Sequence, residues 1–279
     1  MSSESLIWVD GVQASALPLP DRGLDFGDGL FETLLLQRGR LLYSELHLQR
    51  LRSGLQLLGF PACLAAVSEQ LADVQAQLQA WRWSSAAVRL TLTRGQGPRG
   101  YAPPAEATPR IVISATRLDV DHGEMPAPAA LITAQTRWGC QPQLAGIKHL
   151  NRLEQVLAAR ERQLAGADEA LMLDQRQCPV SVTAGNLFVL LGDTLHTPLL
   201  SECGIAGTRR SLVLGQWAPA IGLAVQETQL DLATLENADE VFYSNSLLGL
   251  RPVSSWGTCK WTNHDVCRAL FSQYRAHSA

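Results

Sequence analysis

Residues 117–130 read RLDVDHGEMPAPAA, and this stretch decides how the chain is divided. Pro126 and Pro128 interrupt regular structure there, as prolines do between folded segments. A length of 279 residues slightly favours two domains over one. We therefore expect a small N-terminal domain over residues 1–118, a linker over 119–130 and a large C-terminal domain over 131–279.

The N-terminal side of this stretch mixes strands and helices. The Asp-Gly pair at 10–11 and the Arg-Gly pair at 38–39 predict turns between strands. Residues 95–109, GQGPRGYAPPAEATP, form a Gly- and Pro-rich loop that is too long for a simple hairpin, which indicates a functional role. Apolar patterns predict helices over 45–58 and about 65–82, and strands over 86–94 and 110–117.

The C-terminal side has the same mixed character. Leu150, Leu153, Val156, Leu157 and Leu164 recur with helical spacing just after Lys148. Because strands and helices do not alternate strictly, we expect an α+β fold in both halves and no Rossmann sheet. The further elements that we expect are strands over 169–174, 186–191, 221–228 and 240–245, and helices over 207–215, 230–236 and 262–276.

Composition and charge exclude several classes of function. Hydrophobic residues make up 46% and charged residues 18% of the chain, which is an ordinary globular balance. The net charge of −3 provides no basic field that would attract nucleic acid. We expect no secretory signal and no bilayer-spanning segment. The six cysteines are scattered without a C-x-x-C pair, so we expect no metal site, no disulfide framework and a cytoplasmic location.

Lysine is rare in this sequence. Of 23 Lys and Arg residues, two are lysines, Lys148 and Lys260. A lysine amine can lose its proton when buried and then act as a base or nucleophile, whereas a guanidinium cannot. Lys148 follows apolar residues, so in a closed site desolvation would favour its neutral form. A surface lysine near a helix start is the alternative that this residue alone leaves open.

Three further segments could hold an anion. In GIAGTRRS (204–211) two glycines precede a helix, whose first N–H groups and positive dipole end attract anions. YSNSLLG (243–249) ends a strand in hydroxyl and amide groups, and Arg50 lies one helical turn after His47. Each also has an ordinary explanation: a turn before a helix for residues 204–211, a solvated strand end for residues 243–249, and a solvated cation for Arg50. A reactive amine with an anion cradle is what a pyridoxal phosphate enzyme requires, although spacing alone does not bring these segments together.

Longer motifs run along nearly the whole chain. They are DRGLDFGDGLFET (21–33), HLQRL (47–51), RGQGPRGY (94–101), GIKHLNRLEQVLA (146–158), ADEALMLD (167–174), AGNLF (184–188), GTRR (207–210) and ADEVFYSNSLLGLRPV (238–253). In this order they resemble the class IV (fold-type IV) pyridoxal phosphate enzymes. That family contains branched-chain and D-amino acid aminotransferases and 4-amino-4-deoxychorismate lyase. KHLNRLEQVLA and RGYAPP are most similar to the lyase, since aminotransferases more often have a Tyr near the position of Arg152.

The resemblance implies a two-domain α+β fold like that of D-amino acid aminotransferase, with pyridoxal 5'-phosphate between the domains. It also implies a homodimer whose partner helps to close the site, and no nucleic acid, membrane or metal. The Schiff base would form on Lys148, in the C-terminal domain, with Thr33 as a second catalytic residue. The cofactor would be held by Arg50, Ser181, Thr208, Arg209 and Ser246, and the substrate by Arg99, Tyr101, Asn151 and Arg152.

Ser181 departs from the pattern of the family. Members usually have a Glu five residues before the Asn of AGNLF, where its carboxylate pairs with the pyridinium nitrogen of the cofactor. A serine hydroxyl can only hydrogen-bond there, which leaves that nitrogen mostly neutral and the electron sink weaker. Transamination needs a heavily stabilised carbanion, whereas elimination with aromatisation needs less help. Ser181 therefore favours a lyase, and recruitment of Glu169 or Glu240 in its place is not expected because both lie within strand-like runs.

The resemblance thus implies elimination of pyruvate from 4-amino-4-deoxychorismate, giving 4-aminobenzoate for folate biosynthesis. Two alternatives remain open. One is a branched-chain or D-amino acid aminotransferase of the same fold. The other is a non-catalytic relative that keeps the fold as a binding or assembly subunit, which Ser181 supports and the intact Lys148, Arg50 and GTRR set opposes.

Overall fold

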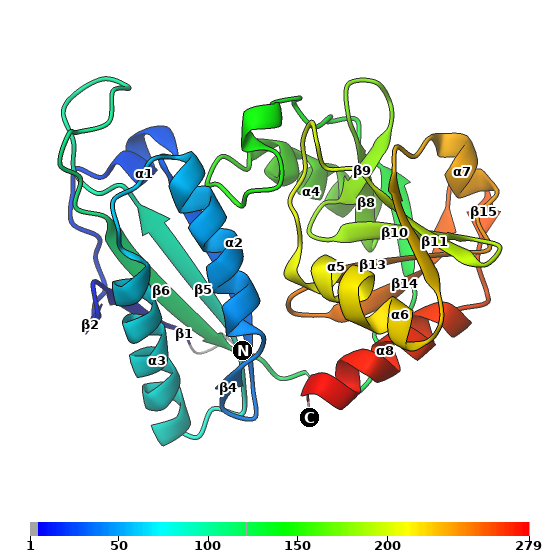
Figure 1. Cartoon of the computed structure of the whole chain (residues 1–279), viewed down its shortest axis with the longest axis horizontal. Helices are drawn as coiled ribbons and strands as arrows, with labels where there is room; N and C mark the ends of the chain where they lie inside the picture. Colours follow the sequence, from blue (N-terminus) through cyan, green and yellow to red (C-terminus); the bar gives the residue numbers. More distant parts are fainter. Residues whose placement is uncertain (1–4, 121, 279) are drawn as a thin grey trace. The chain divides into compact units, whose positions relative to one another are not determined.

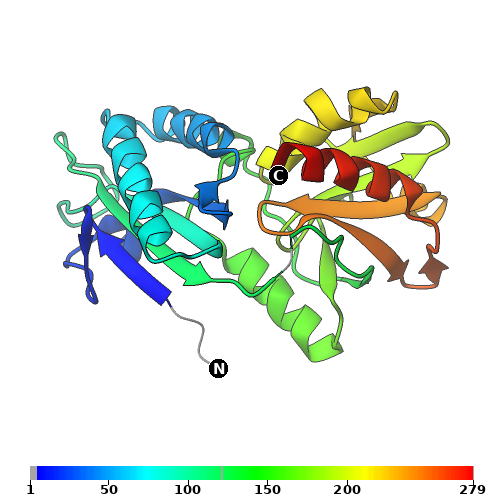
Figure 2. The ribbon, with the colours of Figure 1, turned by 90° about the horizontal axis from the view of Figure 1, so that it is seen from below.

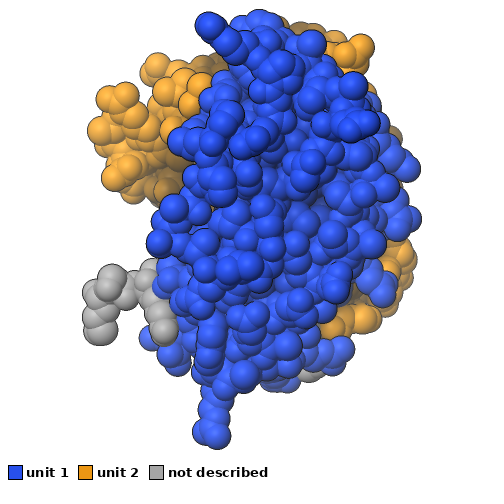
Figure 3. Space-filling view, turned by 90° about the vertical axis from the view of Figure 1, so that its left-hand side faces the viewer, with its two compact units in different colours: residues 1–121, 147–151 blue, residues 122–146, 152–279 orange. Residues whose placement is uncertain are grey.

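The computed structural model describes residues 5–120 and 122–278. Residues 1–4, 121 and 279 lie outside the described part, and with them the first residues of the expected N-terminal domain and one residue of the expected linker. Contacts divide the chain into two compact units, coloured separately in Figure 3. Unit 1 is the chain up to residue 121 together with Ile147–Asn151, and unit 2 is the remainder. Lys148, which the sequence assigned to the C-terminal domain, thus belongs to unit 1 by its contacts.

Unit 1 is an antiparallel sheet with two long helices on one face (Figures 1 and 2). The strands follow the order β2-β1-β6-β5-β3-β4 across the sheet. They are β1 (Ser5–Val9), β2 (Val12–Gln13), β3 (Gly29–Gln37), β4 (Arg40–Leu41), β5 (Ser85–Thr93) and β6 (Arg110–Arg117). The helices are α1 (Arg22–Phe26), α2 (Ser44–Leu57) and α3 (Leu64–Ala80).

The local sequence explains these elements. Asp10 and Gly11 both have positive φ, at 49° and 84°, as a tight turn between β1 and β2 requires. Arg38 and Gly39 do the same between β3 and β4, with φ of 51° and 75°. The predicted helices and strands of this unit are confirmed to within two residues at each end.

Unit 2 is a mixed, curled sheet with helices packed around it (Figure 1). Its order is β12-β11-β10-β13-β14-β7-β8-β9, with β15 paired to β14, and β9 at one end contacts β10. The strands are β7 (Ala129–Thr133), β8 (Glu169–Leu173), β9 (Pro179–Val182), β10 (Asn186–Leu191), β11 (Thr194–Pro198), β12 (Ala224–Thr228), β13 (Glu240–Asn245), β14 (Gly249–Trp256) and β15 (Cys259–Lys260). The helices are η1 (Pro142–Leu144), α4 (Leu153–Ala165), α5 (Thr208–Leu212), the π-helical η2 (Val213–Trp217), α6 (Ala218–Ala220), α7 (Leu232–Glu236) and α8 (Asp265–Ser278).

The two units together confirm the α+β class. In unit 2 the predicted elements are present, but β7, β9, β11, β14 and β15 were not predicted. β14 contains Pro252 and nevertheless lies between β13 and β7, with Pro252 opposite Phe242. Because proline cannot donate to a sheet, a strand with proline is usually assigned to an edge, and the sequence pattern therefore hid this central strand.

The apolar face predicted for the helix after Lys148 is present on α4, and the described residues 5–120 and 122–278 leave it exposed. Leu153 is 77% exposed, Val156 60%, Leu157 49% and Leu164 78%. The α4 residue that is fully buried is Ala158. We refer to Leu153, Val156, Leu157 and Leu164 as the α4 stripe.

Candidate active site

Lys148 lies on a short extended segment, Ile147–Asn151, that pairs with the beginning of β3. The Phe31 N–H donates to the Lys148 carbonyl over 2.9 Å, and the Leu150 N–H donates to the Gly29 carbonyl over 3.1 Å. A Cβ at Gly29 would lie 2.3 Å from the Leu92 carbonyl oxygen of β5, so this position of β3 requires glycine. The backbone that carries the lysine is therefore held by β3.

Two cationic groups contact the ring of Phe31. Lys148 Nζ lies 4.2 Å and Arg89 Cζ lies 4.0 Å from its centroid, and cation–π attraction favours both contacts. Thr33 pairs with Arg89 across β3 and β5, so Phe31, Thr33 and Arg89 share one face of the sheet. The structure therefore brings Lys148 and Thr33 to one face. It adds Phe31, on β3, and Arg89, on β5. Of the two, Arg89 could have been assigned to a face of its strand from the alternation of the predicted strand 86–94.

Arg50 is held by a buried carboxylate. Arg50 Nε donates to Glu32 Oε1 over 2.8 Å, its Nη2 pairs with Oε2, and His47 Nδ1 lies 2.7 Å from the same Oε2. Burial raises the pKa of Glu32, but the charge of Arg50 and the hydrogen bonds from His47 and Arg50 outweigh it and bring the pKa to about 2. The Glu32 carboxylate is therefore ionised, and it fixes the direction of the Arg50 guanidinium.

Three of the predicted cofactor residues meet in unit 2. Thr208 Oγ1 and Ser246 Oγ are 3.4 Å apart, and Arg209 Nη2 donates to the Ser246 carbonyl over 3.1 Å. Arg209 is 1% exposed. The N–H groups of the α5 start, two hydroxyls and a buried guanidinium are suited to an anion with several oxygen atoms.

Gly207 precedes α5 at its N-cap, and it leaves room for a neighbouring side chain. A Cβ on Gly207 would lie 2.0 Å from Asn186 Oδ1. Asn186 cannot move away easily, since its Nδ2 donates to the Ile205 carbonyl over 2.8 Å. Residue 207 therefore has to be glycine, because a side chain there would collide with Asn186.

Ser181 lies on β9 and is 4% exposed. Trp138 Nε1 donates to its Oγ over 3.0 Å. The guanidinium of Arg152 lies over the Trp138 ring, 5.3 Å from the centroid. Burial lowers the pKa of Arg152 to about 10, against the opposing charge of Glu154. Trp138 was not found by sequence reasoning, because the stretch that contains it has no recognisable pattern.

The two glutamates considered as replacements for Ser181 have other partners. The Glu240 carboxylate accepts the backbone N–H groups of Val266 and Cys267 at the start of α8, over 3.0 Å and 2.7 Å. Glu169 accepts the N–H of Ala170 over 2.9 Å. Both carboxylates therefore accept backbone N–H groups in this structure.

The predicted substrate residues of unit 1 lie around the end of α1 and in the long loop. Tyr101 is 87% exposed and packs edge-on against Phe26, with 5.5 Å between ring centroids. Asn151 Nδ2 donates to the Gly27 carbonyl over 3.3 Å. Arg99 is exposed in the same loop as Tyr101. The fourth predicted substrate residue, Arg152, belongs to unit 2.

Two negative findings limit the classes of site. Within residues 5–120 and 122–278, no group of three or more His, Cys, Asp or Glu side chains could hold a metal ion. Over the same described ranges, no helix has the length and apolar character needed to cross a membrane.

Comparison with known protein families shows to which family this chain belongs. The model of the family described as "Amino-transferase class IV" matches residues 29–256, which is most of the chain. This protein is a class IV aminotransferase family member. The resemblance drawn from the sequence motifs is confirmed, and the enzymes of this family depend on pyridoxal phosphate.

Individual members of the family differ in activity. This class IV protein is 34% identical to an aminodeoxychorismate lyase of Vibrio harveyi, over 89% of this chain and 90% of the relative. It is 30% identical to a putative branched-chain-amino-acid aminotransferase of Methanocaldococcus jannaschii, over 84% and 80%. A 4-amino-4-deoxychorismate lyase structure from Pseudomonas aeruginosa has a TM-score of 0.89 and 41% identity, covering 97% of this chain and 98% of that one. The fold-type IV assignment is therefore confirmed.

The residues present fit the family's cofactor. Lys148 supplies an amine against an aromatic ring, and the cradle of Thr208, Arg209 and Ser246 suits a phosphate.

Proposed function

We propose that this class IV protein is an aminodeoxychorismate lyase, which eliminates pyruvate from 4-amino-4-deoxychorismate and releases 4-aminobenzoate. The observation that carries the proposal is its likeness to two lyases over nearly the full length of each chain. Ser181 favours this chemistry over transamination, because a hydroxyl held by Trp138 has no charge with which to keep a ring nitrogen protonated.

Lys148 has two roles in this proposal. When bound, pyridoxal phosphate forms a covalent bond to the amine and withdraws electrons from carbon C4 of the substrate. With the substrate bound, the neutral Lys148 amine would remove the C4 proton. The bond from C3 to the enolpyruvyl oxygen then breaks, the ring becomes aromatic, and the proton passes to the leaving group, which becomes pyruvate. The Lys148 amine would also bring about the release of 4-aminobenzoate.

The other proposed site residues would bind and orient the cofactor and the substrate. Thr208, Arg209 and Ser246 would bind the phosphate, with Arg50 as a further cation fixed by Glu32. Ser181 would donate its hydroxyl proton to the ring nitrogen. The substrate carboxylates would be bound by Arg99, Tyr101, Asn151 and Arg152, and Thr33 would line the pocket beside the lysine.

The test uses the scarcity of lysine in this chain. The holoenzyme is reduced with borohydride, digested and mapped, and the cofactor is expected on Lys148. Lys148→Ala should lose the near-visible absorbance band and pyruvate release from aminodeoxychorismate. Lys260→Ala is the matched control, and it should keep both. A band that survives in Lys148→Ala, or label on Lys260, would contradict the assignment.

The aminotransferase alternative is favoured by the similarity to the Methanocaldococcus relative. Incubation of the protein with a branched-chain or D-amino acid and 2-oxoglutarate separates the two functions. Amino-group transfer without pyruvate formation from aminodeoxychorismate would favour that alternative. Failure to bind pyridoxal phosphate at all would favour a non-catalytic relative.

The functional unit of this proposal is a homodimer. The α4 stripe places four large apolar side chains on one side of a helix at positions i, i+3, i+4 and i+11. Contiguous exposed apolar surface of this kind usually marks an interaction site. A second copy of the chain is the partner that the family resemblance implies, and it would cover the stripe.

A further inference from the structure

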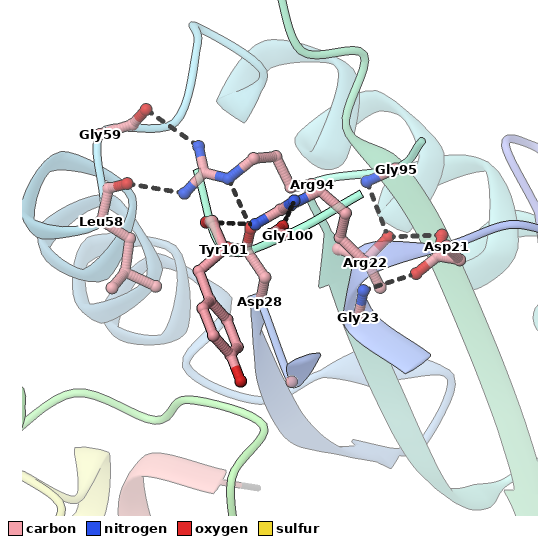
Figure 4. A network of polar contacts seen from close by, with 12 residues as sticks. Asp21, Arg22, Gly23, Asp28, Leu58, Gly59, Arg94, Gly95, Gly100 and Tyr101 are labelled. Atoms are coloured by element: carbon pink, nitrogen blue, oxygen red, sulfur yellow. Dashed lines mark hydrogen bonds and ion pairs between the residues drawn. The ribbon is translucent and has the colours of Figure 1, made fainter. Parts of the chain in front are cut away.

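The loop of residues 95–109 carries two proposed substrate ligands, Arg99 and Tyr101, and it has no helix or strand of its own. A loop of this length needs contacts elsewhere to hold its side chains in place. Several of those contacts come from one buried residue, Arg22 (Figure 4). Arg22 is the first residue of α1 and is 3% exposed.

Arg22 contacts the loop at its beginning and in its middle. Its backbone N–H donates to the Gly95 carbonyl over 2.9 Å. Its Nη1 donates to the Gly100 carbonyl over 3.0 Å, and its Nη2 donates to the Tyr101 carbonyl over 2.8 Å. These two carbonyls directly follow Arg99, so Arg22 fixes the peptide groups at the point where the proposed ligands project.

The third nitrogen of the guanidinium fixes its orientation. Arg22 Nε donates to Asp28 Oδ2 over 2.9 Å. The centroid of the Phe26 ring lies 4.8 Å from Arg22 Cζ. The same ring also packs against the ring of Tyr101. A planar fork with five N–H donors can bind a carboxylate and two carbonyls at once, which a lysine ammonium on a flexible stem cannot reproduce.

Arg94 provides a comparison within the same network. Its Nε donates to the same oxygen, Asp28 Oδ2, over 2.8 Å. Its two terminal nitrogens, however, donate to the carbonyls of Leu58 and Gly59 after α2, over 2.7 Å and 3.1 Å. Figure 4 shows the two guanidinium groups meeting at Asp28 and diverging to different segments. Arg94 thus shares the anchor of Arg22 but does not hold the loop carbonyls.

We propose that Arg22 is a positioning residue for substrate binding: anchored by Asp28, it holds the backbone of residues 100 and 101 so that Arg99 and Tyr101 are presented to a substrate carboxylate. The substrate part of this proposal rests on the proposed function, whereas the loop-holding part does not. Arg22 is 3% exposed, and all three nitrogens of its guanidinium donate to groups of the protein. Its loss should therefore weaken substrate binding more than it slows the chemical step.

The experiment compares Arg22→Lys with Arg94→Lys in the holoenzyme. Arg22→Lys should raise KM for aminodeoxychorismate about tenfold, with kcat within about twofold of the parent. It should also keep the near-visible band and become sensitive to trypsin at the bond after Arg99, mapped by mass spectrometry. Arg94→Lys should leave KM within about twofold and that bond protected.

A variant on the loop side tests the same contact if Arg22→Lys fails to fold. A Cβ at Gly97 would lie 2.6 Å from Arg22 Cδ, so Gly97→Ala pushes the loop away from the guanidinium. It should reproduce the raised KM and the cleavage after Arg99.

Each further outcome decides the proposal. An unchanged KM and a protected loop in the folded Arg22→Lys or Gly97→Ala protein would overturn it, and so would equal cleavage after Arg99 in Arg94→Lys. If the parent releases no pyruvate, the proposed function fails, and the trypsin comparison still decides whether Arg22 holds the loop.

Discussion

Trp138 Nε1 donates a hydrogen bond to Ser181 Oγ over 3.0 Å, and neither residue is more than 5% exposed. A hydroxyl that accepts from an indole keeps its own proton for a third group. The Ser181 hydroxyl can therefore donate its own proton, and in the proposed function it would donate to a neutral ring nitrogen with a free lone pair. In the proposed function Trp138 would act through Ser181, whose hydroxyl it orients.

The first prediction tests this hydrogen bond by stability. Ser181→Ala leaves the buried Trp138 N–H without its acceptor, and it should lower the free energy of unfolding by about 1–3 kcal/mol. In a Trp138→Phe background the same change should cost much less, because no donor remains. Urea unfolding of the four proteins measures the coupling. Equal costs in both backgrounds would show that the two groups do not interact.

The second prediction concerns the charge at position 181. Ser181→Glu should raise amino-group transfer from D-alanine to 2-oxoglutarate by about tenfold, since a carboxylate would stabilise a protonated ring nitrogen. Ser181→Gln is similar in size but has no charge, so it should not raise this rate. A flat or lower rate in Ser181→Glu would count against the electron-sink interpretation, as would an equal gain in Ser181→Gln.

The third prediction concerns the start of α5. Gly207→Ala would place a Cβ against Asn186 and disturb the N–H groups of the phosphate cradle. Its affinity for pyridoxal phosphate should fall by about tenfold or more, measured by titration of the near-visible band. Gly215→Ala is the matched control on the same helical run, because its Cβ would meet nothing within 4 Å. Similar affinities in the two variants would argue against the cradle.

The fourth prediction is a pH dependence of stability. The pKa of Glu32 is about 2 in the folded chain, against an ordinary value of 4.5. A depressed carboxyl pKa stabilises the fold above the unfolded value and loses this contribution as pH falls toward the folded value. The parent should therefore lose about 3 kcal/mol between pH 5 and pH 2 that Glu32→Gln does not lose. Chemical unfolding of both proteins across that range measures the difference, and parallel curves would contradict it.

The sequence predicted most of the fold where local patterns and turn chemistry act alone. The Asp10-Gly11 and Arg38-Gly39 turns and the long helices of unit 1 follow from such signals. β14 was not predicted, because Pro252 argues against a strand at this place in the sequence. Pairing of β14 with β13 and β7 overrides this local preference.

The candidate site was predictable where sequence motifs contain its residues, and not where a role depends on tertiary contacts. Motifs located Lys148, Thr208, Arg209 and Ser246, and the last three meet in the structure. Phe31, Arg89 and Trp138 were missed, since their roles depend on which groups lie across a sheet or under a ring. Arg22 lay inside a quoted motif, but only the coordinates show that its guanidinium holds a loop more than seventy residues away.

The fifth prediction concerns the α4 stripe. Leu157→Glu would place a charge in the proposed contact between two copies, where an unpaired carboxylate is costly. The homodimer should dissociate at micromolar concentration in sedimentation velocity, with the helix content of the monomer retained. Leu199→Glu is the control, because Leu199 is 50% exposed, close to the 49% of Leu157, but lies outside the stripe. It should stay dimeric. If Leu157→Glu remains dimeric as well, the contact lies elsewhere and the stripe needs another partner.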